Sequence, residues 1–254
     1  MSYPGNTKSN LLTTLLRRVY SIYAVLIFVL TFLIVLPVYL FADWFDKPRL
    51  GLIVNHYWAK VYFCLIGIPV EIEGQINFDN SKNYILCANH FSFLDVAIMP
   101  FAPVPFKYVG KISISKIPFF GYMFKRFHIT VDRDKVRSKY DTYKKSIDSL
   151  LNGFSLAIFP EGGIRSIEPP KMASFKEGPF RMAVETGVLL MPVSFADNWH
   201  IFPEDGKYFI HRRKCRIVFH APIDPKNYSL DTLKDFRNDV FDVIQKGLDS
   251  KFDN

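Results

Sequence analysis

The stretch Tyr84-Ile-Leu-Cys-Ala-Asn-His-Phe-Ser-Phe-Leu-Asp95 decides how this chain folds and where its chemistry lies. Its first five residues form an apolar run that is typical of a buried strand, and the run ends abruptly in Asn89-His90. Asp95 follows five residues after the histidine, in a segment that is predicted to be helical from about Phe93. A neutral imidazole accepts a proton near pH 7, and a nearby carboxylate can fix its tautomer and stabilise the imidazolium. We therefore predict that His90 is a general base and that Asp95 is its partner.

The spacing of His90 and Asp95 is not unique in the chain. His200 is also followed five residues later by an aspartate, Asp205, and Asn55-His56 repeats the Asn-His pair without a carboxylate at that distance. Only His90 combines the preceding strand, the asparagine and the acid. We therefore expect His200 to be a loop residue without a catalytic role.

Beyond residue 70 the sequence alternates between strand-like and helix-like segments. Strands are predicted at residues 70–73, 84–88, 106–109, 128–131, 155–159, 188–195 and 214–219. Helical patterns separate them, and the helix over 138–151 is expected to have Tyr140, Tyr143, Ile147 and Leu150 or Leu151 on one side. This alternation predicts an α/β fold with a mixed, largely parallel sheet that is covered by helices.

The first 69 residues have a different character. Residues 21–41 contain no charged side chain, and 21 residues form about 30 Å of helix, enough to cross a membrane. Bulky residues follow instead of a small-residue cleavage site, so we expect a retained anchor, with a buried core helix as the alternative. The apolar segment 50–70 carries polar interruptions and several aromatic side chains, which favours an interfacial helix. We thus predict a membrane-binding helical hairpin over residues 1–69 and a catalytic domain over residues 70–254, and we leave open whether the hairpin spans the bilayer.

The charge balance favours an anionic partner. There are 32 basic and 24 acidic residues, giving a net charge of +8, which suits an anionic bilayer, a phosphorylated substrate, an acidic carrier protein or nucleic acid. The three cysteines, Cys64, Cys87 and Cys215, are scattered without metal-ligand spacing and are expected to be buried thiols in a reducing compartment. No metal site is expected at His90, because only Asp95 lies at ligand spacing from it.

Two further predicted strands also end in unusual residues. One is followed by Asp132-Arg133-Asp134, and the other by Pro160-Glu-Gly-Gly-Ile-Arg-Ser166. Adjacent glycines let backbone N–H groups approach an anion closely, arginine binds phosphate in a bidentate manner, and Glu161 can hold an arginine or a substrate hydroxyl. Lys107 and Lys111 either add positive potential to the same cleft or are solvated. The alternative for all of these residues is a charged surface loop.

Four blocks in this order resemble the glycerolipid acyltransferases, most closely the lysophosphatidic acid acyltransferases. They are Asn89-His90-x4-Asp95, Arg133 at a strand end, Phe-Pro-Glu-Gly followed by Arg165-Ser166, and Met191-Pro192-Val193. The resemblance covers residues 67–196. It departs from the family pattern in the second block, at Phe127 and Thr130, and in the third, where one extra residue separates the first glycine from the arginine.

The resemblance implies transfer of an acyl group from acyl-CoA or acyl carrier protein to the free hydroxyl of lysophosphatidic acid, which gives phosphatidic acid. It implies His90 as the base and Asp95 as its orienting partner. The substrate-binding residues are then expected to be Asn89, Lys107, Arg133, Glu161, Gly162, Gly163 and Arg165. We expect membrane lipids as partners, no nucleic acid, no metal and no cofactor besides the thioester co-substrate. The catalytic domain is expected on the cytoplasmic face of a membrane.

Two alternatives to this function remain open. One is the same chemistry on a different acceptor, such as another lysophospholipid, glycerol 3-phosphate or an amine-headed lipid. The other is a membrane-tethered lipid-binding protein without turnover.

Overall fold

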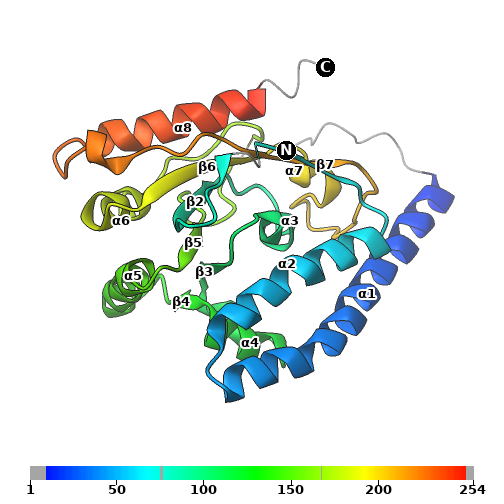
Figure 1. Ribbon diagram of the computed structural model, residues 1–254. Helices are drawn as coiled ribbons and strands as arrows, with labels where there is room; N and C mark the ends of the chain where they lie inside the picture. The colour runs from blue at the N-terminus through cyan, green and yellow to red at the C-terminus, as the bar shows by residue number, and fades with distance from the viewer. Residues whose placement is uncertain (1–9, 75–76, 167, 250–254) are drawn as a thin grey trace.

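The computed structural model describes residues 10–74, 77–166 and 168–249 and contains one seven-stranded sheet (Figure 1). The strand order is β1-β7-β6-β2-β5-β3-β4. β6, β2, β5, β3 and β4 run parallel, whereas β7 is antiparallel to β6 and β1 runs parallel to β7. The mixed, largely parallel sheet predicted from the sequence is thus confirmed. The strands are β1 (Val70–Glu73), β2 (Tyr84–Ala88), β3 (Phe106–Lys111), β4 (Ile129–Val131), β5 (Ser155–Ile158), β6 (Leu189–Phe195) and β7 (Cys215–Phe219).

The central strand β2 is apolar throughout because it is covered on both faces. It pairs with β6 on one side and β5 on the other, and all five of its residues are buried. Leu86 and Ala88 contribute to the core on one face of the sheet, while Ile85 and Cys87 contribute to the core on the other face. Alternate side chains of a strand point to opposite faces, so a strand between two helical layers needs apolar residues at every position.

Helices cover both faces of the sheet (Figure 1). The core on one face contains residues from α5, α6 and α8, and the core on the other face contains residues from α2, α3 and α4. The helices are α1 (Leu11–Trp44), α2 (Pro48–Leu65), α3 (Leu94–Ile98), α4 (Phe120–Phe127), α5 (Val136–Leu151), α6 (Gly178–Thr186), α7 (Asn198–Ile201) and α8 (Leu233–Asp249). Short 3-10 turns are η2 (Met99–Phe101), η3 (Ile112–Lys116) and η4 (Pro225–Asn227).

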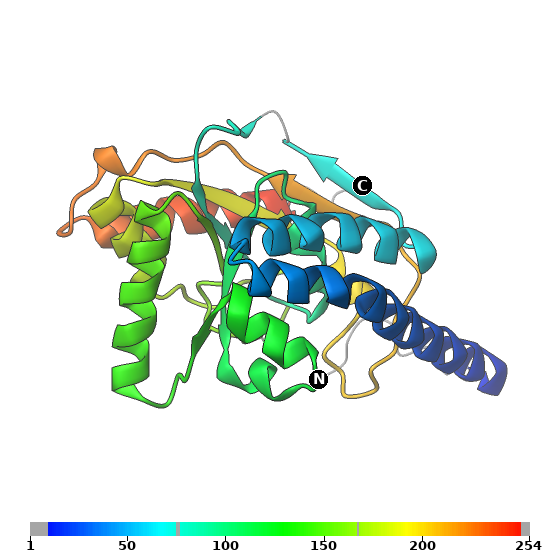
Figure 2. The same ribbon diagram turned by 60° about the horizontal axis from the view of Figure 1, so that its bottom comes forward.

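The N-terminal hairpin packs as two successive layers, with α2 against the sheet side and α1 outside it (Figures 1 and 2). Tyr62 and Phe63 of α2 are buried in the same core as residues of β2 and β6. Tyr62 and Phe63 therefore fill the space between α1 and the body of the protein, whereas Tyr57 of the same helix is 63% exposed, and the interfacial position of α2 stays a prediction. The outer helix α1 is longer than the uncharged segment that predicted it and includes Arg17 and Arg18.

Two smaller expectations are corrected. Tyr140 of α5 is 69% exposed, whereas Tyr143, Ile147 and Leu150 of the same predicted face pack in or against the core, beside the buried Thr142, Ser146 and Ser149. Small hydroxyl side chains fit there because they bond within the helix or to its neighbour, as when Ser146 donates to the carbonyl of Thr142. His200, expected in a loop, lies in the one-turn helix α7.

His128, which follows α4, generates a prediction on acid stability. It is buried, its Nδ1 accepts a hydrogen bond from the Tyr108 amide at 3.2 Å, and burial together with Lys107 lowers its pKa from 6.5 to about 3. Below pH 6.5 the imidazole of His128 is therefore protonated in the unfolded chain and stays neutral in the folded chain. The free energy of unfolding consequently falls as the pH falls. Between pH 7 and 5 this residue should cost about 2 kcal/mol of unfolding free energy, and His128→Asn should remove that part of the decline.

Denaturant titrations of both proteins in detergent at pH 7 and pH 5 would measure this difference. Only the change with pH is compared, so a constant loss of packing in the variant cancels. An equal decline in the two proteins would contradict the prediction.

Candidate active site

His90 and Asp95 meet at the carboxyl end of β2. The strand ends at Ala88, the chain turns, and α3 begins at Leu94, which brings Asp95 Oδ2 to 3.0 Å from His90 Nδ1. The aspartate side chain has no exposed surface, and that of the histidine is 12% exposed. Because a carboxylate can only accept, Nδ1 carries the shared proton and Nε2 is left as the acceptor. The predicted pairing is therefore present.

The Asp95 carboxylate also organises the loop that holds it. Oδ2 accepts hydrogen bonds from the backbone amides of Phe91 at 2.8 Å and Ser92 at 2.9 Å. Ser92 in turn donates its hydroxyl proton to the carbonyl of Phe202 at 2.7 Å. A buried charge needs such donors to offset the loss of hydration, so the acid stabilises the loop as well as the imidazole.

Asn89, predicted to bind substrate, has a different role. Its side chain is fully buried, Oδ1 accepts from the Phe195 amide at 2.8 Å, and Nδ2 donates to the Phe195 carbonyl at 3.2 Å. The amide of Asn89 thereby continues the pairing of β2 with β6 beyond the last strand residue. This corrects the prediction, because neither polar atom of the side chain faces an open space.

Glu161 joins the histidine to the glycine turn after β5. Its Oε1 accepts from the His90 amide at 2.7 Å and its Oε2 from the Ala173 amide at 2.9 Å. Phe159, two residues earlier, stacks on the His90 ring with centroids 4.1 Å apart. Burial raises the pKa of Glu161 to about 7, against the opposing effect of the two amide donors. Each oxygen of Glu161 thus already accepts from one backbone amide, and a contact of Glu161 with an arginine or a substrate hydroxyl stays a prediction.

The turn Gly162–Gly163 gathers three cationic side chains. Both glycines have positive φ, +78° and +146°. A Cβ at Gly162 would lie 2.6 Å from Lys176 Nζ, and one at Gly163 would lie 3.4 Å from Arg133 Nη1 and 4.0 Å from Arg165 Nε. Arg133 also donates a hydrogen bond to the carbonyl of Gly162. The extra residue of this block is therefore absorbed in a two-glycine bend, and Arg165 still reaches the turn.

Electrostatics at this turn favour an anion. Burial and the positive charge of Arg165 lower the pKa of Arg133, and burial, Arg165 and Arg133 lower the pKa of Lys176. Among the described residues, none of these three side chains forms an ion pair with a carboxylate. Mutual repulsion without a counter-charge is relieved when an anion binds between the cations. We call Arg133, Arg165 and Lys176 the cation cluster.

Lys176 belongs to this cluster although no strand-end pattern indicates it. It lies in the loop before α6, and its amide donates to the Pro160 carbonyl at 2.9 Å, which folds the loop back onto the glycine turn. The signal in the sequence is only a lysine 18 residues after Ile158, the last residue of β5, at a position that is equally compatible with a solvated surface.

Lys107, by contrast, is not part of the site. It lies near the start of β3, in register with Leu156 of β5, and so towards the amino-terminal end of the parallel strands. Its Nζ lies 3.4 Å from Ser149 Oγ and 4.0 Å from the ring centroid of Phe154. His90 follows the carboxyl end of β2, at the opposite edge of the sheet, so the prediction that Lys107 binds substrate is wrong.

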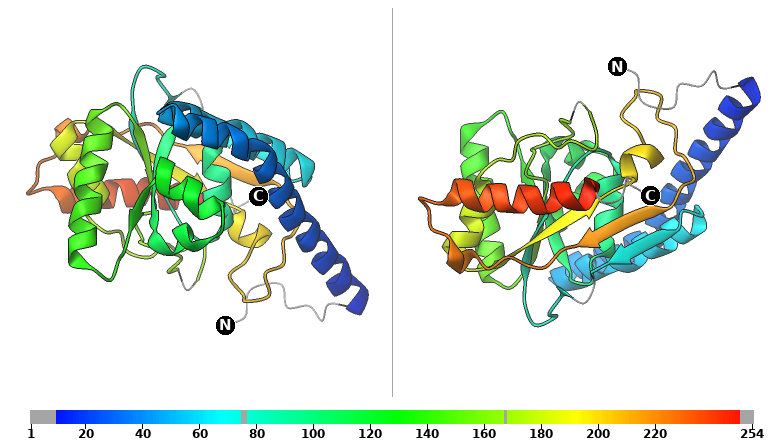
Figure 3. Two further views of the ribbon diagram at one scale, coloured as in Figure 1. Left: turned by 90° about the horizontal axis from the view of Figure 1, so that it is seen from below. Right: turned by 90° about the horizontal axis from the view of Figure 1, so that it is seen from above.

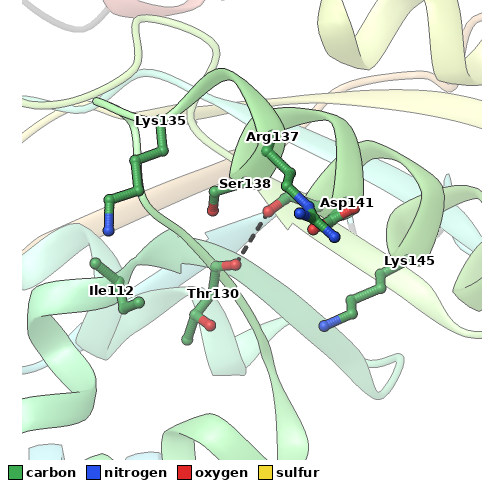
Figure 4. Close-up of a pocket in the computed structure, with 8 residues that line it drawn as sticks. Ile112, Thr130, Lys135, Arg137, Ser138, Asp141 and Lys145 are labelled. Carbon is green, nitrogen blue, oxygen red and sulfur yellow. Dashed lines mark hydrogen bonds between the residues drawn. The ribbon is translucent and has the colours of Figure 1, made fainter.

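A hollow of about 290 Å³ lies between η3, β4 and α5, and none of the predicted site residues lines it (Figure 4). Its lining mixes positive and negative charge with hydroxyl groups: Ile112, Thr130, Lys135, Arg137, Ser138, Asp141, Thr142 and Lys145. Within the described part of the chain, no three His, Cys, Asp or Glu side chains are grouped so that they could hold a metal ion.

Comparison with known proteins bears on the same region. The family model described as Acyltransferase matches residues 69–196, which include His90, Asp95, the glycine turn and the cation cluster. The chain is 30% identical over 205 residues to a 1-acyl-sn-glycerol-3-phosphate acyltransferase of Borreliella burgdorferi, with 80% of each chain covered. It is 31% identical over 200 residues to a chloroplastic protein of that name from Arabidopsis thaliana, with 76% of this chain and 55% of the relative covered.

The chain thus spans little more than half the length of the chloroplastic relative. A solved structure, the 1-acyl-sn-glycerophosphate (LPA) acyltransferase PlsC from Thermotoga maritima, superposes with a TM-score of 0.77 at 24% identity. The superposition covers 94% of this chain and 98% of the Thermotoga maritima chain. The two proteins therefore have the same fold from the N-terminal hairpin onwards. The solved structure shows the shared fold, and the matched segment together with the identity to the Borreliella burgdorferi relative shows that this chain belongs to the acyltransferase family.

Proposed function

We propose that this protein transfers a fatty acyl group from an acyl thioester to the free hydroxyl of lysophosphatidic acid and so forms phosphatidic acid. The observation that carries the proposal is the buried Asp95 carboxylate 3.0 Å from His90, joined through Glu161 to a glycine turn with three cations around it. The names of the relatives support the choice of acceptor.

In the proposed reaction His90 acts as the base. Its free Nε2 takes the proton of the acceptor hydroxyl as the oxygen attacks the thioester carbonyl, and the resulting tetrahedral intermediate carries the negative charge on the former carbonyl oxygen. Asp95 stabilises the imidazolium through Nδ1. When the C–S bond breaks, the imidazolium returns the proton to the departing thiolate. A thioester is already an activated acyl donor, so holding both substrates together supplies much of the rate and no covalent enzyme intermediate is needed.

The cation cluster is the proposed seat of the acceptor's phosphate. Arginine binds phosphate in a bidentate manner, lysine adds a point charge, and the glycine turn lets backbone amides approach the oxygens. Glu161 contributes by fixing the His90 amide and the Ala173 amide. The Glu161 side chain thereby fixes the distance between His90 and the proposed phosphate site at the glycine turn.

We further propose that α1 attaches the protein to the membrane. By length and composition it is the one helix, within the described part of the chain, that is apolar enough to cross a bilayer. One side of α1 packs against α2 and α4, where Ala24, Thr31, Phe32, Tyr39 and Ala42 are buried, and this packing favours a position in one leaflet. The outward side remains apolar, with exposed residues that include Leu26, Leu30, Ile34, Phe41 and Trp44.

The segment around α4 continues this surface (Figure 3). Arg126 and Tyr122 both bond to Asp43 of α1, while Ile117 and Phe119 are 51% and 67% exposed. Lysines flank these apolar side chains at positions 111, 116 and 125. Apolar and aromatic residues bordered by lysines suit the headgroup region of an anionic bilayer. The three cysteines are free thiols, which fits a catalytic domain on the cytoplasmic face.

Detergent-solubilised protein incubated with lysophosphatidic acid and either acyl-CoA or acyl carrier protein thioester should form phosphatidic acid. His90→Ala should lower the rate by at least about 100-fold, because general base catalysis contributes that much or more. His56→Ala is the matched control, because this histidine of α2 bonds to the Pro100 carbonyl and to none of the site residues, and it should leave the rate unchanged. Product analysis by thin-layer chromatography measures both. Folded wild-type protein that gives no product with either donor would refute the proposal, whereas product with a competing acceptor only would redirect it to that acceptor.

Substitution of Gly162 should raise the KM for lysophosphatidic acid. Gly162→Ala is expected to cost roughly 1–2 kcal/mol of stability from its positive φ, and its Cβ must also displace Lys176. Loss of one charge-assisted contact corresponds to about tenfold in KM. Gly206→Ala is the matched control, because Gly206 has φ +74° and nothing within 4 Å of an added Cβ. Equal KM values for the two variants would contradict a phosphate site at this turn.

The membrane surface can be mapped with a fluorescent probe. Cys64 is exposed while Cys87 and Cys215 are buried, so Cys64→Ser leaves a background in which an introduced cysteine can be labelled. A probe on Ile117→Cys should shift its emission to shorter wavelength when anionic vesicles are added. A probe on Leu230→Cys, at 48% exposure in the loop before α8, should not shift. The same response at both positions would refute the proposed surface.

A further inference from the structure

We infer that Asn198 is a positioning residue for the His90–Asp95 pair and that Cys215 fixes the orientation of its side-chain amide. The inference rests on the proposed role of His90 as the base. It concerns a residue 103 positions away from Asp95 in the sequence, in the one-turn helix α7 that follows β6.

The two oxygens of the Asp95 carboxylate are bonded differently. Oδ2 has three N–H donors, which are His90 Nδ1 and the amides of Phe91 and Ser92. Oδ1 accepts from Asn198 Nδ2 at 2.7 Å, and among the described residues this is its one hydrogen bond. Neither Asp95 nor Asn198 has any exposed surface. The carboxylate plane is therefore fixed at both oxygens, and Asn198 alone fixes the second.

Cys215 determines which way the Asn198 amide points. The Cys215 thiol, on β7, donates to Asn198 Oδ1 at 2.7 Å. Burial keeps the pKa of this thiol well above its ordinary value, so it remains a proton donor. A donor on one side requires the amide oxygen there, which turns the NH₂ group towards Asp95. The reversed amide would face the carboxylate with its own oxygen and cost two hydrogen bonds.

The backbone that carries Asn198 is held by the neighbouring residue. Arg216 donates from Nε and Nη2 to the two carboxylate oxygens of Asp197, at 2.6 and 2.8 Å. The Asp197 carbonyl accepts from the amides of His200 and Ile201, which closes the turn of α7. Consecutive residues of β7, Cys215 and Arg216, thus hold the side chain and the backbone of the same short helix.

This arrangement matters for the proposed proton transfer. The imidazole is oriented by Asp95, so a carboxylate that rotates about its Cβ–Cγ bond moves the Nε2 lone pair away from the acceptor hydroxyl. Misplacement by about 1 Å can reduce a rate by up to about 100-fold. Asn198 prevents this rotation without touching either substrate, so its removal should lower kcat and leave KM unchanged.

Asn198→Ala should reduce kcat by about 10- to 100-fold, with the KM for both substrates within about twofold of wild type. Asn198→Ala should also move the acid limb of kcat/KM to higher pH, because loss of this donor leaves more negative charge on Asp95, which favours the protonated imidazole. Cys215→Ser retains a donor and should keep kcat close to wild type, whereas Cys215→Ala should lower it. Steady-state kinetics across pH 5–9 separate these outcomes from a purely structural role, which would move none of the pH limbs.

Asn55→Ala is the matched control, since Asn55 is a buried asparagine in α2 that bonds to Tyr39 rather than to Asp95. It should lose stability without a change in kcat per folded molecule. Wild-type kcat and pH profile in Asn198→Ala, or the same loss in Asn55→Ala, would overturn the inference.

Absence of turnover in the wild-type protein would refute the proposed function instead. NMR of the His90 ring then tests the inference by itself, because the Nδ1 proton shared with Asp95 should exchange faster with water in Asn198→Ala than in Asn55→Ala. Unchanged exchange would overturn it.

Discussion

A fully buried carboxylate is the constraint on which the rest of this site depends. Asp95 has no exposed surface, so every hydrogen bond that water would have supplied must come from the protein. The donors come from the loop after β2, from the imidazole of His90, and from α7 after β6. A single charge therefore holds together segments that lie more than 100 residues apart, and it requires the strands that carry them to be neighbours in the sheet.

The sheet meets this requirement through its strand order. β2 lies between β5 and β6, so the residues after these three strands emerge side by side at one edge. Asn89 bonds to the backbone of β6, and Glu161 bonds to the amide of His90. Ligands of open α/β sheets bind at this edge, outside the carboxyl ends of the strands. Asn89 and Glu161 thus fasten the ends of the three strands to one another.

Features that depend on neighbours in the sequence could be predicted. β2 followed from five consecutive apolar residues, and the His90–Asp95 contact followed from a spacing that the turn between β2 and α3 closes. Features that depend on distant contacts could not. Asn89 and Glu161 have the composition of ligand-binding residues, but their partners are backbone amides and carbonyls that no local pattern reveals. Lys107 is close to the site in sequence, yet the direction of β3 places it at the other end of the strands.

The two-layer packing of α1 and α2 has a consequence for how this enzyme fold can be divided. A boundary at residue 70 separates an apolar region from an α/β region by composition. The buried side chains form cores across this boundary. Tyr62 and Phe63 lie in one core with residues of β2, and Phe32 lies in another core with Phe127. A truncation there would expose aromatic surface that is normally covered, and the remaining fragment would be prone to aggregate. The hairpin is therefore a structural part of the catalytic body. A soluble version of the protein requires polar replacements on the outward side of α1 rather than deletion of the hairpin.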